Sequence, residues 1–557
     1  MENNCQACNQ SFLVTPEHRK MLDTVAPVIN GTTHTLPDPT VCKDCRHQRR
    51  LTHRNDSNYY KNNCAACKKD VISIYSADSN YPVYCHDCFW SDQWDPASYG
   101  KEFDFNRPFF EQFNELKNTV PRLCIFNTQS ENSEYTVHSS KNKNGYMCSS
   151  NVGCEDVYFS DWAINCTTCS DLFMCFDMTC CYNCNNSRQC YNSDYLDLCT
   201  DVTDSYLNFD CNNSKNLLGC VSLKNKEYHM LNKEVTKEEF ETTLKRLKTD
   251  RAFCDEFNAK YQALKQSIPK RAAWNINTEN SVGDYLKNTK NAHYCFNSMD
   301  IEDCMYSEGI VNNRNCCDIT RGSGMEGCYE CEGIVELNLS SFCNLTYQCH
   351  SLLYCDNGHS SDNCFGCFSF KSAQFCILNK QYTQQEYEEL VPRIIEHMKK
   401  TGEWGEFFPT TISSFCYNQT KAMAEFPLSK EGVLQRGWQW SETENPDTSG
   451  INAIEADLLP EDINTVPDDM LNYVIKPKND GKLFRLIPQE LNFYRSKGLP
   501  IPRMHPNQRQ QALLARQNKT KLYSRTCDHC LCDIQTTYSP DAPETVYCDT
   551  CYLSEVY

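Results

Sequence analysis

Cysteine recurs at multiples of three residues through the middle of the chain. Of the 25 cysteines between positions 148 and 376, 22 share one phase modulo three. The other positions in this phase carry mainly Val, Ile, Leu, Met, Ser or Ala, for example Leu172 and Ile319. A period of three fits neither an α-helix at 3.6 residues per turn nor a strand at 2.0. It predicts a narrow, cysteine-rich β-solenoid, a mainly β fold in which one residue in three points inward.

The length of one coil stays open at this point. A coil of four triplets would stack Cys331, Cys343, Cys355 and Cys367 in one column, and coils of three or five triplets align nearly as many cysteines. Free cysteine behaves as a small buried hydrophobe, so we interpret the in-phase thiols as interior packing. Additional metal ligation and disulfide bonding are the two alternatives.

The cysteine-rich region is duplicated. Two similar stretches begin at Gly219 and at Gly366, and a second similar pair is offset by the same 147 residues. Each copy ends in a predicted helix with a capping-box signature, at Thr236 and at Thr383. We expect these helices to cap the two solenoid repeats, and we expect Pro392 to kink or restart the second helix.

Cysteines near the two ends of the sequence follow a different spacing. Paired CxxC motifs supply four thiolates each, as in structural zinc sites. The predicted ligand sets are Cys5, Cys8, Cys42 and Cys45; Cys64, Cys67, Cys85 and Cys88; and Cys527, Cys530, Cys548 and Cys551. Because the gap between the two motifs is identical in the second and the third set, we predict zinc ribbons with two knuckles each. A thioredoxin-like redox pair is the rival interpretation of a CxxC motif.

Basic residues lie beside these motifs. We predict that they contact nucleic-acid phosphates, although a solvated helix face or docking on the acidic body of the protein itself would also explain them. The residues are Arg46, Arg49, Arg50, Arg54, Arg509, Arg516, Lys519 and Lys521. The net charge of −19 excludes a uniformly basic nucleic-acid-binding surface, so such contacts would have to be local.

Hydropathy and the N-terminal sequence bear on the compartment. No stretch approaches the roughly 20 apolar residues that span a bilayer, and the first residues do not have the pattern of a signal peptide. We therefore expect a cytoplasmic, reducing environment in which thiols stay free or bind metal.

The pattern predicts eight segments. They are residues 1–55, zinc-binding knuckles with a basic arm; 56–122, zinc ribbon and helical connector; 123–235, first solenoid repeat; 236–285, helical cap and linker; 286–380, second solenoid repeat; 381–436, helical cap; 437–480, acidic linker; and 481–557, basic arm and zinc ribbon. The linker is expected to be extended because nine acidic residues and three prolines occur between positions 437 and 475 without any Lys or Arg.

Four stretches are similar to a known family. They read "VCKDCRHQRRLTHRND", "YPVYCHDCFWSDQWDPASYGKEFDFNRPFFEQF", "ILNKQYTQQEYEELVPRIIEHMKKTGEWGEFFP" and "CDIQTTYSPDAPETVYCDTCYLSEVY". Together they resemble long zinc-ribbon proteins with a cysteine-dense repeat, found mainly in uncultured small-genome bacteria. Some members of that family carry a loosely applied CoA-transferase label. The resemblance implies an architecture and supplies no function.

Motifs of common enzymes do not stand out. The sequence has no P-loop, GxSxG or HExxH, and the GxGxxG match at residues 322–327 lies in the repeat region without a βαβ context. We therefore favour a non-enzymatic zinc-binding scaffold with a protein or nucleic-acid partner. The alternatives are an enzyme of CoA-transferase type and a thiol-rich redox or metal-buffering protein.

Overall fold

The computed structural model describes residues 2–79, 81–442, 452–478 and 482–556. Strands account for 35% of the residues and helices for 26%, which confirms the prediction of a mainly β protein. The chain divides into two compact units, and each unit is built from two separate stretches. Unit 1 comprises residues 1–125 and 273–442, and unit 2 comprises residues 126–272 and 443–557.

Unit 2 contains the first ladder, a stack of short parallel strands. An antiparallel strand, β22 (Lys233–Glu234), ends it, and two short strands, β9 (Asn127–Thr128) and β11 (Ser139–Ser140), pair near its start. Its other strands are β10 (Tyr135–Val137), β12 (Tyr146–Ser149), β13 (Glu155–Tyr158), β14 (Asp161–Ile164), β15 (Thr167–Phe176), β16 (Tyr182–Asn185), β17 (Asp194–Asp197), β18 (Thr200–Thr203), β19 (Tyr206–Phe209), β20 (Asn212–Leu218) and β21 (Glu227–Met230).

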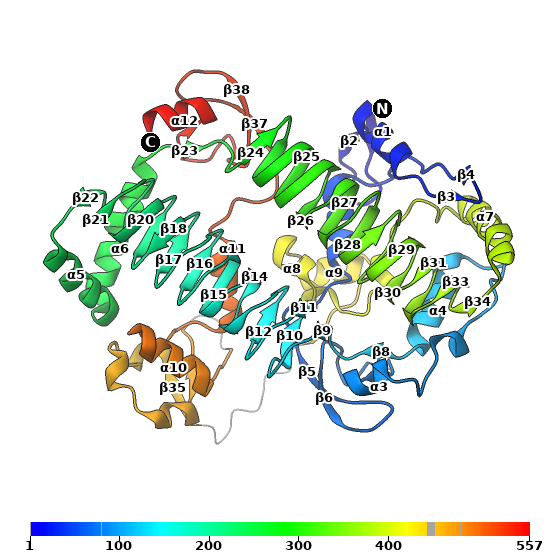
Figure 1. Ribbon diagram of the computed structural model, residues 1–557, viewed down its shortest axis with the longest axis horizontal. Coiled ribbons are helices and arrows are strands. Elements are labelled where there is room, and N and C mark those ends of the chain that lie inside the picture. The colour runs from blue at the N-terminus through cyan, green and yellow to red at the C-terminus, as the bar shows by residue number, and fades with distance from the viewer. Residues whose placement is uncertain (1, 80, 443–451, 479–481, 557) are drawn as a thin grey trace. The chain divides into compact units, whose positions relative to one another are not determined.

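Unit 1 contains the second ladder, which has the same organisation. An antiparallel strand, β34 (Lys380–Gln381), ends it. Its other strands are β24 (Ile276–Glu279), β25 (Val282–Met305), β26 (Glu308–Val311), β27 (Arg314–Ser323), β28 (Tyr329–Asn338), β29 (Tyr347–Leu353), β30 (Asp356–His359), β31 (Asp362–Phe365), β32 (Phe368–Lys371) and β33 (Gln374–Ile377). In Figure 1 the strands of each ladder lie one above another as flat, stacked coils.

Strand pairing sets the length of a coil. In both ladders a residue pairs in parallel with the residue 12 positions later, as Val157 does with Cys169 and Cys304 with Cys316. The first coil of the second ladder is one residue shorter, because Ile276 pairs with Lys287. A regular coil is therefore four triplets long, one of the three lengths that the cysteine spacing allowed.

The residues in the three-residue phase form the interior of each ladder. Cys304, Cys331 and Leu337 are fully buried in the second ladder, and Cys169 and Leu172 are fully buried in the first. These side chains pack in columns along the stack, so one position in three is withdrawn from water. Each side of a coil therefore contributes a single layer of side chains to the hydrophobic core of its ladder.

A left-handed residue precedes most interior positions. Met147, immediately before Cys148, has a φ of 53°, and Asn183 and Asp303 have φ values of 55° and 51° before Cys184 and Cys304. This conformation costs most residue types about 1–2 kcal/mol, and Asn and Asp tolerate it best. The repeated corner therefore explains both the period of three and the abundance of Asn and Asp beside the cysteines.

Interior thiols also donate hydrogen bonds to the backbone. The Sγ of Cys175 lies 3.5 Å from the carbonyl oxygen of Phe173 and 3.4 Å from that of Cys184. Ser193 uses its hydroxyl in the same way toward Tyr191 at 2.9 Å. All 40 cysteines belong to the described residues, and none of them forms a disulfide. Cysteine thus combines a small volume with a donor that a Val or an Ala would lack.

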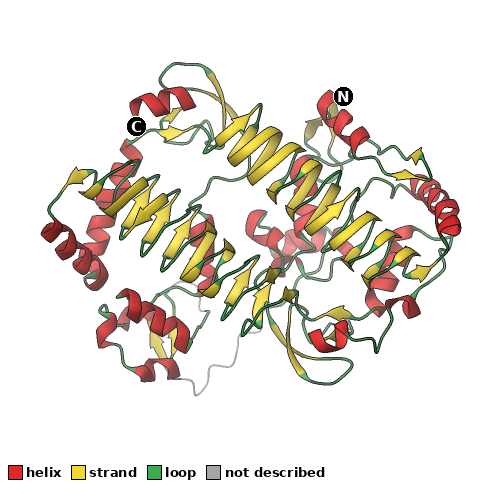
Figure 2. Cartoon of the chain, in the orientation of Figure 1, coloured by secondary structure: helices red, strands yellow, loops and turns green. Residues whose placement is uncertain are grey.

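Helices follow the last strand of each ladder. α5 (Lys237–Thr249) begins at the Thr236 capping box, and α7 (Gln384–Thr401) begins at the Thr383 capping box, so both predicted signatures are confirmed. α7 continues through Pro392 as one helix and does not restart there. Figure 2 shows that the ladders themselves consist of strands and loops, with the helices outside them. No helix among the described residues is long and apolar enough to cross a membrane.

A helix packs at an equivalent glycine in each unit. In unit 1, Phe109 of α4 (Phe109–Thr119) lies so close to Gly366 that an added Cβ would be 2.7 Å from its ring. In unit 2, Phe257 of α6 (Arg251–Ser267) stands at the same 2.7 Å from a Cβ added at Gly219. Because Gly219 and Gly366 are equivalent positions of the duplication, the two ladders receive their helices at the same place in the repeat.

The predicted acidic linker is folded where it is described. Residues 452–478 contain β35 (Ala453–Glu455), three short 3-10 helices and β36 (Val474–Lys476), and β35 pairs with β36. Leu459, Ile463 and Val466 are buried in a core that also includes α10 (Pro488–Lys497). These apolar residues are spaced three or four apart and pack together, whereas the acidic side chains stay outside. Positions 443–451 and 479–480 of the predicted linker lie outside the described residues.

Substitution at Cys355 tests the limited width of the core. The thiol of Cys355 is fully buried and donates to the carbonyl oxygens of Leu353 and Cys364. Cys355→Leu should destabilise unit 1 by about 1–3 kcal/mol, because the extra methyl groups overpack the column. Cys355→Ser should cost less, since its hydroxyl reaches the same carbonyls. Urea unfolding of both variants measures the difference, and a leucine variant as stable as the serine variant would contradict the width argument.

Candidate metal centres

Three groups of cysteine thiols converge in the structure. Within each group the sulfur atoms lie within 4.8 Å of one another. The groups are Cys5, Cys8, Cys42 and Cys45; Cys64, Cys67, Cys85 and Cys88; and Cys527, Cys530, Cys532 and Cys548. We call them clusters 1, 2 and 3. The first two contain the cysteines predicted from spacing. In cluster 3 the convergent group contains Cys532 in place of the predicted Cys551. The spacing argument missed Cys532 because it is not part of a CxxC pair with a partner at fixed distance.

The distances between thiols fit a tetrahedral metal. A zinc ion with Zn–S bonds of about 2.3 Å holds its sulfur ligands about 3.8 Å apart. The sulfur atoms of Cys8 and Cys42 are 3.9 Å apart, those of Cys67 and Cys85 are 3.8 Å apart, and those of Cys530 and Cys548 are 3.7 Å apart. All three clusters are therefore geometrically able to hold a thiophilic ion such as zinc.

The first pair of cysteines in each cluster sits on a β-hairpin. The hairpins are β1 (Glu2–Asn4) with β2 (Ser11–Leu13), β5 (Tyr60–Asn63) with β6 (Asp70–Ser73), and β37 (Tyr523–Thr526) with β38 (Asp533–Thr536). A left-handed residue turns the chain after each pair: Asn9, Lys68 and Leu531, with φ between 60° and 64°. The local backbone is thus the same in all three clusters.

The second pair of cysteines begins a helix and does not form a second knuckle. Cys42, Cys85 and Cys548 are the N-caps of α2 (Lys43–Leu51), α3 (His86–Trp90) and α12 (Asp549–Glu555). Our prediction of two knuckles per site was wrong at this point. The sequence after each third cysteine continues as a helix, whose N-terminal dipole favours a thiolate.

Backbone N–H groups support the first thiolate of each cluster. The amide of Cys42 donates to the Sγ of Cys5, that of Cys85 to Cys64, and that of Cys548 to Cys527, at 3.2–3.3 Å. Although burial opposes ionisation, such amide donors lower the pKa of Cys64 to about 6, and that of Cys527 also to about 6. Both thiols are thereby prepared to bind a cation.

Several thiols inside the ladders have the opposite character. Burial raises the pKa of Cys148, Cys175 and Cys295 to about 12, so these thiols stay protonated. Among the described residues, no in-phase ladder cysteine belongs to a group of three or more convergent ligands. The ladder cysteines therefore act in packing and backbone hydrogen bonding in this structure.

Two mixed groups also bring possible ligand atoms together in unit 1. His18 lies with Cys317 and Asp318, and His47 lies with Glu308 and Glu425. Burial lowers the pKa of His18 to about 4, which keeps its imidazole neutral. Asp318 is committed to arginine side chains, as described below, so the first group is part of an ion-pair network.

The basic residues of α2 are turned into the second ladder. Arg46 and Arg50 are 2% and 1% exposed, and both pair with Asp318, at 2.9 and 3.2 Å. Arg49 pairs with Glu330 at 2.9 Å and, through its other nitrogen, with Glu406. Burial opposes the ionisation of Asp318, yet Arg46 and Arg50 hold its pKa below the ordinary value.

The last arginine of this group is buried as well. Arg54, just after α2, is 1% exposed and pairs with Asp56 at 2.7 Å and with Glu332 at 2.8 Å. The four arginines predicted as phosphate ligands thus stabilise the interior of unit 1. In this arrangement Arg46, Arg50 and Arg54 present no guanidinium group to a nucleic acid.

The C-terminal basic residues divide into two classes. Arg509 of α11 (Pro506–Leu514) is 1% exposed and pairs with Asp171 at 3.3 Å and Glu490 at 3.1 Å. Arg516 pairs with Asp197 at 3.2 Å and is partly exposed. Lys519 and Lys521 remain on the surface. Of the four predicted C-terminal residues, these two lysines and part of Arg516 are open to a phosphate group.

Arg46 and Arg509 occupy equivalent places in the two units. Arg46 and Arg509 are as far apart in the sequence as Cys64 and Cys527, the first cysteines of clusters 2 and 3. Their acidic partners, Asp318 and Asp171, are 147 residues apart, which is the offset of the duplicated ladders. Each guanidinium also lies over an aromatic ring: Arg46 over Tyr306 at 5.5 Å and Arg509 over Phe159 at 4.7 Å. Tyr306 and Phe159 have the ladder offset as well, so one docking arrangement is used twice.

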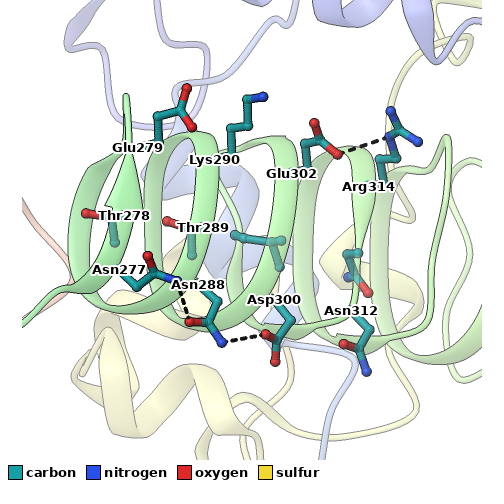
Figure 3. Close-up of a pocket in the computed structure, with 12 residues that line it drawn as sticks. Asn277, Thr278, Glu279, Asn288, Thr289, Lys290, Asp300, Glu302, Asn312 and Arg314 are labelled. Carbon is teal, nitrogen blue, oxygen red and sulfur yellow. Dashed lines mark hydrogen bonds and ion pairs between the residues drawn. The ribbon is translucent and has the colours of Figure 1, made fainter.

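Polar side chains line a groove on the second ladder, with a volume of about 650 Å³ (Figure 3). Asn277 donates to Asn288 at 2.9 Å, and Asn288 donates to Asp300 at 2.8 Å, so amides form a row along the stack. A second row alternates in charge from Glu279 and Lys290 to Glu302 and Arg314. The arrangement offers hydrogen-bonding groups at a regular spacing and contains no predicted metal ligand.

No protein-family model matches the sequence, and no curated protein matches it. The function therefore has to be argued from the clusters and ladders themselves.

The buried arginine of α11 provides a stability test. Arg509→Met should destabilise unit 2 by about 3–5 kcal/mol, because it leaves the carboxylate of Asp171 buried without its cation. Burial already raises the pKa of Asp171 to about 6, although Arg509 opposes the rise. Arg46→Met should cost less, since Arg50 still pairs with Asp318.

Lys519→Met is the matched control, because Lys519 is an exposed cation in the same segment. It should leave the urea midpoint unchanged, and adding Asp171→Asn to Arg509→Met should recover part of the loss. An Arg509→Met protein that unfolds at the wild-type urea concentration would contradict the proposed role of the ion pair.

Acid should weaken the contact between α3 and the second ladder. His359 is 6% exposed, stacks on Tyr347 and meets Trp90 of α3 edge-on at 4.9 Å. Burial, with a smaller effect of Lys371, lowers its pKa to about 3. Below about pH 6.5 the imidazole of His359 is protonated in the unfolded chain but stays neutral in the folded protein. The free energy of unfolding therefore falls by about 2 kcal/mol between pH 7 and pH 5.

His359→Phe keeps an aromatic ring stacked on Tyr347 and removes the imidazole that can be protonated. The difference in unfolding free energy between pH 7 and pH 5 should be smaller in this variant than in the wild type. Both proteins share the same cysteine clusters, so acid effects on those sites cancel in the comparison. Equal pH dependence of the two proteins would contradict the assignment.

Proposed function

We propose that this protein is a non-enzymatic zinc-dependent scaffold. Each unit would consist of a narrow β-solenoid, formed by the ladder, and of zinc-ribbon-like modules whose helices dock on it. The observation that carries the proposal is the spacing of the cluster thiols, 3.7–3.9 Å for the three pairs above, on backbones that repeat three times. The resemblance to long zinc-ribbon proteins agrees with this class.

Zinc would act here by fixing a helix end. Cys42 and Cys45 belong to cluster 1, and the same helix, α2, carries Arg46 into the second ladder one residue later. A metal that holds the first turn of α2 therefore also sets the position of Arg46 above Asp318. The four thiolates of a closed site leave no coordination position for a substrate, which supports a structural role.

Partner binding would use the outer faces of the coils. The groove of Figure 3 offers Asn, Asp, Glu, Lys and Arg side chains at the spacing of stacked strands. The overall charge of −19 and the burial of most predicted phosphate-binding arginines favour a protein partner over a nucleic acid. A rigid ladder presents such a surface with little loss of conformational entropy on binding.

Metal analysis of the purified protein tests the proposal. We expect three zinc ions per chain, one for each cluster. Ladder thiols should react with a thiol reagent only after denaturation, because they are buried. Removal of zinc with a chelator should expose α2 to limited proteolysis before it affects the ladder strands. A metal content far above three would contradict the packing role of the ladder cysteines, and no bound metal would contradict the scaffold as proposed.

A further inference from the structure

Cluster 3 holds one more thiol than a four-coordinate zinc ion takes. Cys532 converges with Cys527, Cys530 and Cys548 within 4.8 Å. Cys551 lies in the first turn of α12, three residues after the N-cap Cys548, and its thiol is outside this group of four. Five thiols are therefore candidates for one four-coordinate site, and Cys532 and Cys551 are the two alternatives for its fourth position.

The equivalent positions in the other clusters show which thiol is additional. Cys551 stands where Cys88 stands in cluster 2, since both are the last cysteine of their second CxxC motif. The position of Cys532 is taken by Lys69 in cluster 2 and by Gln10 in cluster 1. Cys532 is thus the residue by which cluster 3 departs from its two counterparts.

Formation of the hairpin does not require a thiol at position 532. The carbonyl oxygen of Cys532 accepts the amide of Cys527 at 2.8 Å, as that of Lys69 accepts Cys64 and that of Gln10 accepts Cys5. Only backbone atoms take part in these bonds, so three different side chains serve equally well. The side chain of Cys532 is therefore free for another role.

The two competing thiols approach from different sides. Cys551 is 7% exposed and belongs to the buried core of this module, whereas Cys532 and Cys530 are exposed. When Cys532 is the fourth ligand, two exposed thiolates of the hairpin hold the metal on its solvent side. An incoming thiolate from another molecule can then reach the ion.

We propose that Cys532 and Cys551 exchange as the fourth ligand of a zinc ion in cluster 3, and that this exchange makes cluster 3 a zinc donor to thiol-bearing acceptors. In the exchange, a zinc–sulfur bond to Cys532 forms as the bond to Cys551 breaks. The entering thiol releases a proton, the leaving thiolate takes one up, and zinc keeps its charge. The proposal rests on the zinc-binding role proposed above and assigns a regulation to one of its three sites.

Zinc content separates the two thiols. Cys551→Ser should still bind three zinc ions, because Cys532 completes the site, whereas Cys88→Ser in cluster 2 should bind two. The measurement is elemental analysis of the full-length protein after gel filtration. A Cys551→Ser protein with two zinc ions would overturn the inference. Fewer than three ions in the wild type would overturn the proposed function itself, which is a different outcome.

Transfer kinetics test the exchange independently of whether Cys551→Ser folds. With excess dithiothreitol as the thiol-bearing acceptor and the chromogenic chelator 4-(2-pyridylazo)resorcinol reporting the released metal, the wild type should lose one zinc ion in a separate fast phase. Cys532→Lys, which introduces the residue type of cluster 2, should lose this fast phase and keep three ions. Leu531→Lys changes the exposed neighbour without changing a thiol and should retain the fast phase. A fast phase that persists in Cys532→Lys would overturn the exchange.

Discussion

Parallel backbone hydrogen bonds between successive coils hold each coil to the next, and most other features of the molecule follow from them. The pairing of Cys304 with Cys316 and of Leu352 with Cys364 places like positions above one another. With a left-handed corner in nearly every triplet, only one side chain in three can point inward. The resulting interior is too narrow for large residues throughout, and cysteine fits because it is small and because its S–H satisfies a backbone carbonyl, as the thiol of Cys355 does for Leu353. Its use in the ladders is structural and needs no metal.

Charge burial connects the ladders to the cysteine clusters. In each unit a helix beside a cluster inserts an arginine above an acidic residue on a ladder corner: Arg46 above Asp318 and Arg509 above Asp171. An ion pair in such a place is costly to break, because either partner alone is left charged in the interior. The two arginines are separated by the same number of residues as clusters 2 and 3, and the two acidic residues by the same number as the ladders. Both units therefore contain an equivalent helix and ladder, but the helix precedes the ladder in the sequence of unit 1 and follows it in unit 2. Each unit therefore combines stretches that are distant in the sequence.

Several features could be predicted from local patterns, and several could not. The capping boxes at Thr236 and Thr383 were predictable because a cap depends on residues three apart. The thiols of clusters 1 and 2 were predictable because two CxxC pairs at a suitable distance are typical of a metal site. The burial of Arg46, Arg50 and Arg54 was not predictable, because their acidic partners in the ladder lie far along the chain. An exposed basic helix would have the same local sequence. The fold of residues 452–478, within the predicted linker at 437–480, was not predictable either, because a sparse apolar spacing among acidic residues does not show which side chains pack together.

The sequence by itself determined the interior of the ladders, since a period of three with cysteine in phase allows only a narrow coil with one inward residue per triplet. It also determined which cysteines gather in clusters 1 and 2, because the ligands of each cluster lie on short, repeated motifs. Tertiary structure alone decided that a coil has four triplets, because three or five align the cysteines nearly as well and only strand pairing distinguishes them. Tertiary structure likewise decided that the arginines are buried and that Cys532 joins cluster 3. Burial and convergence depend on which segments approach one another in space, and no local sequence pattern shows this.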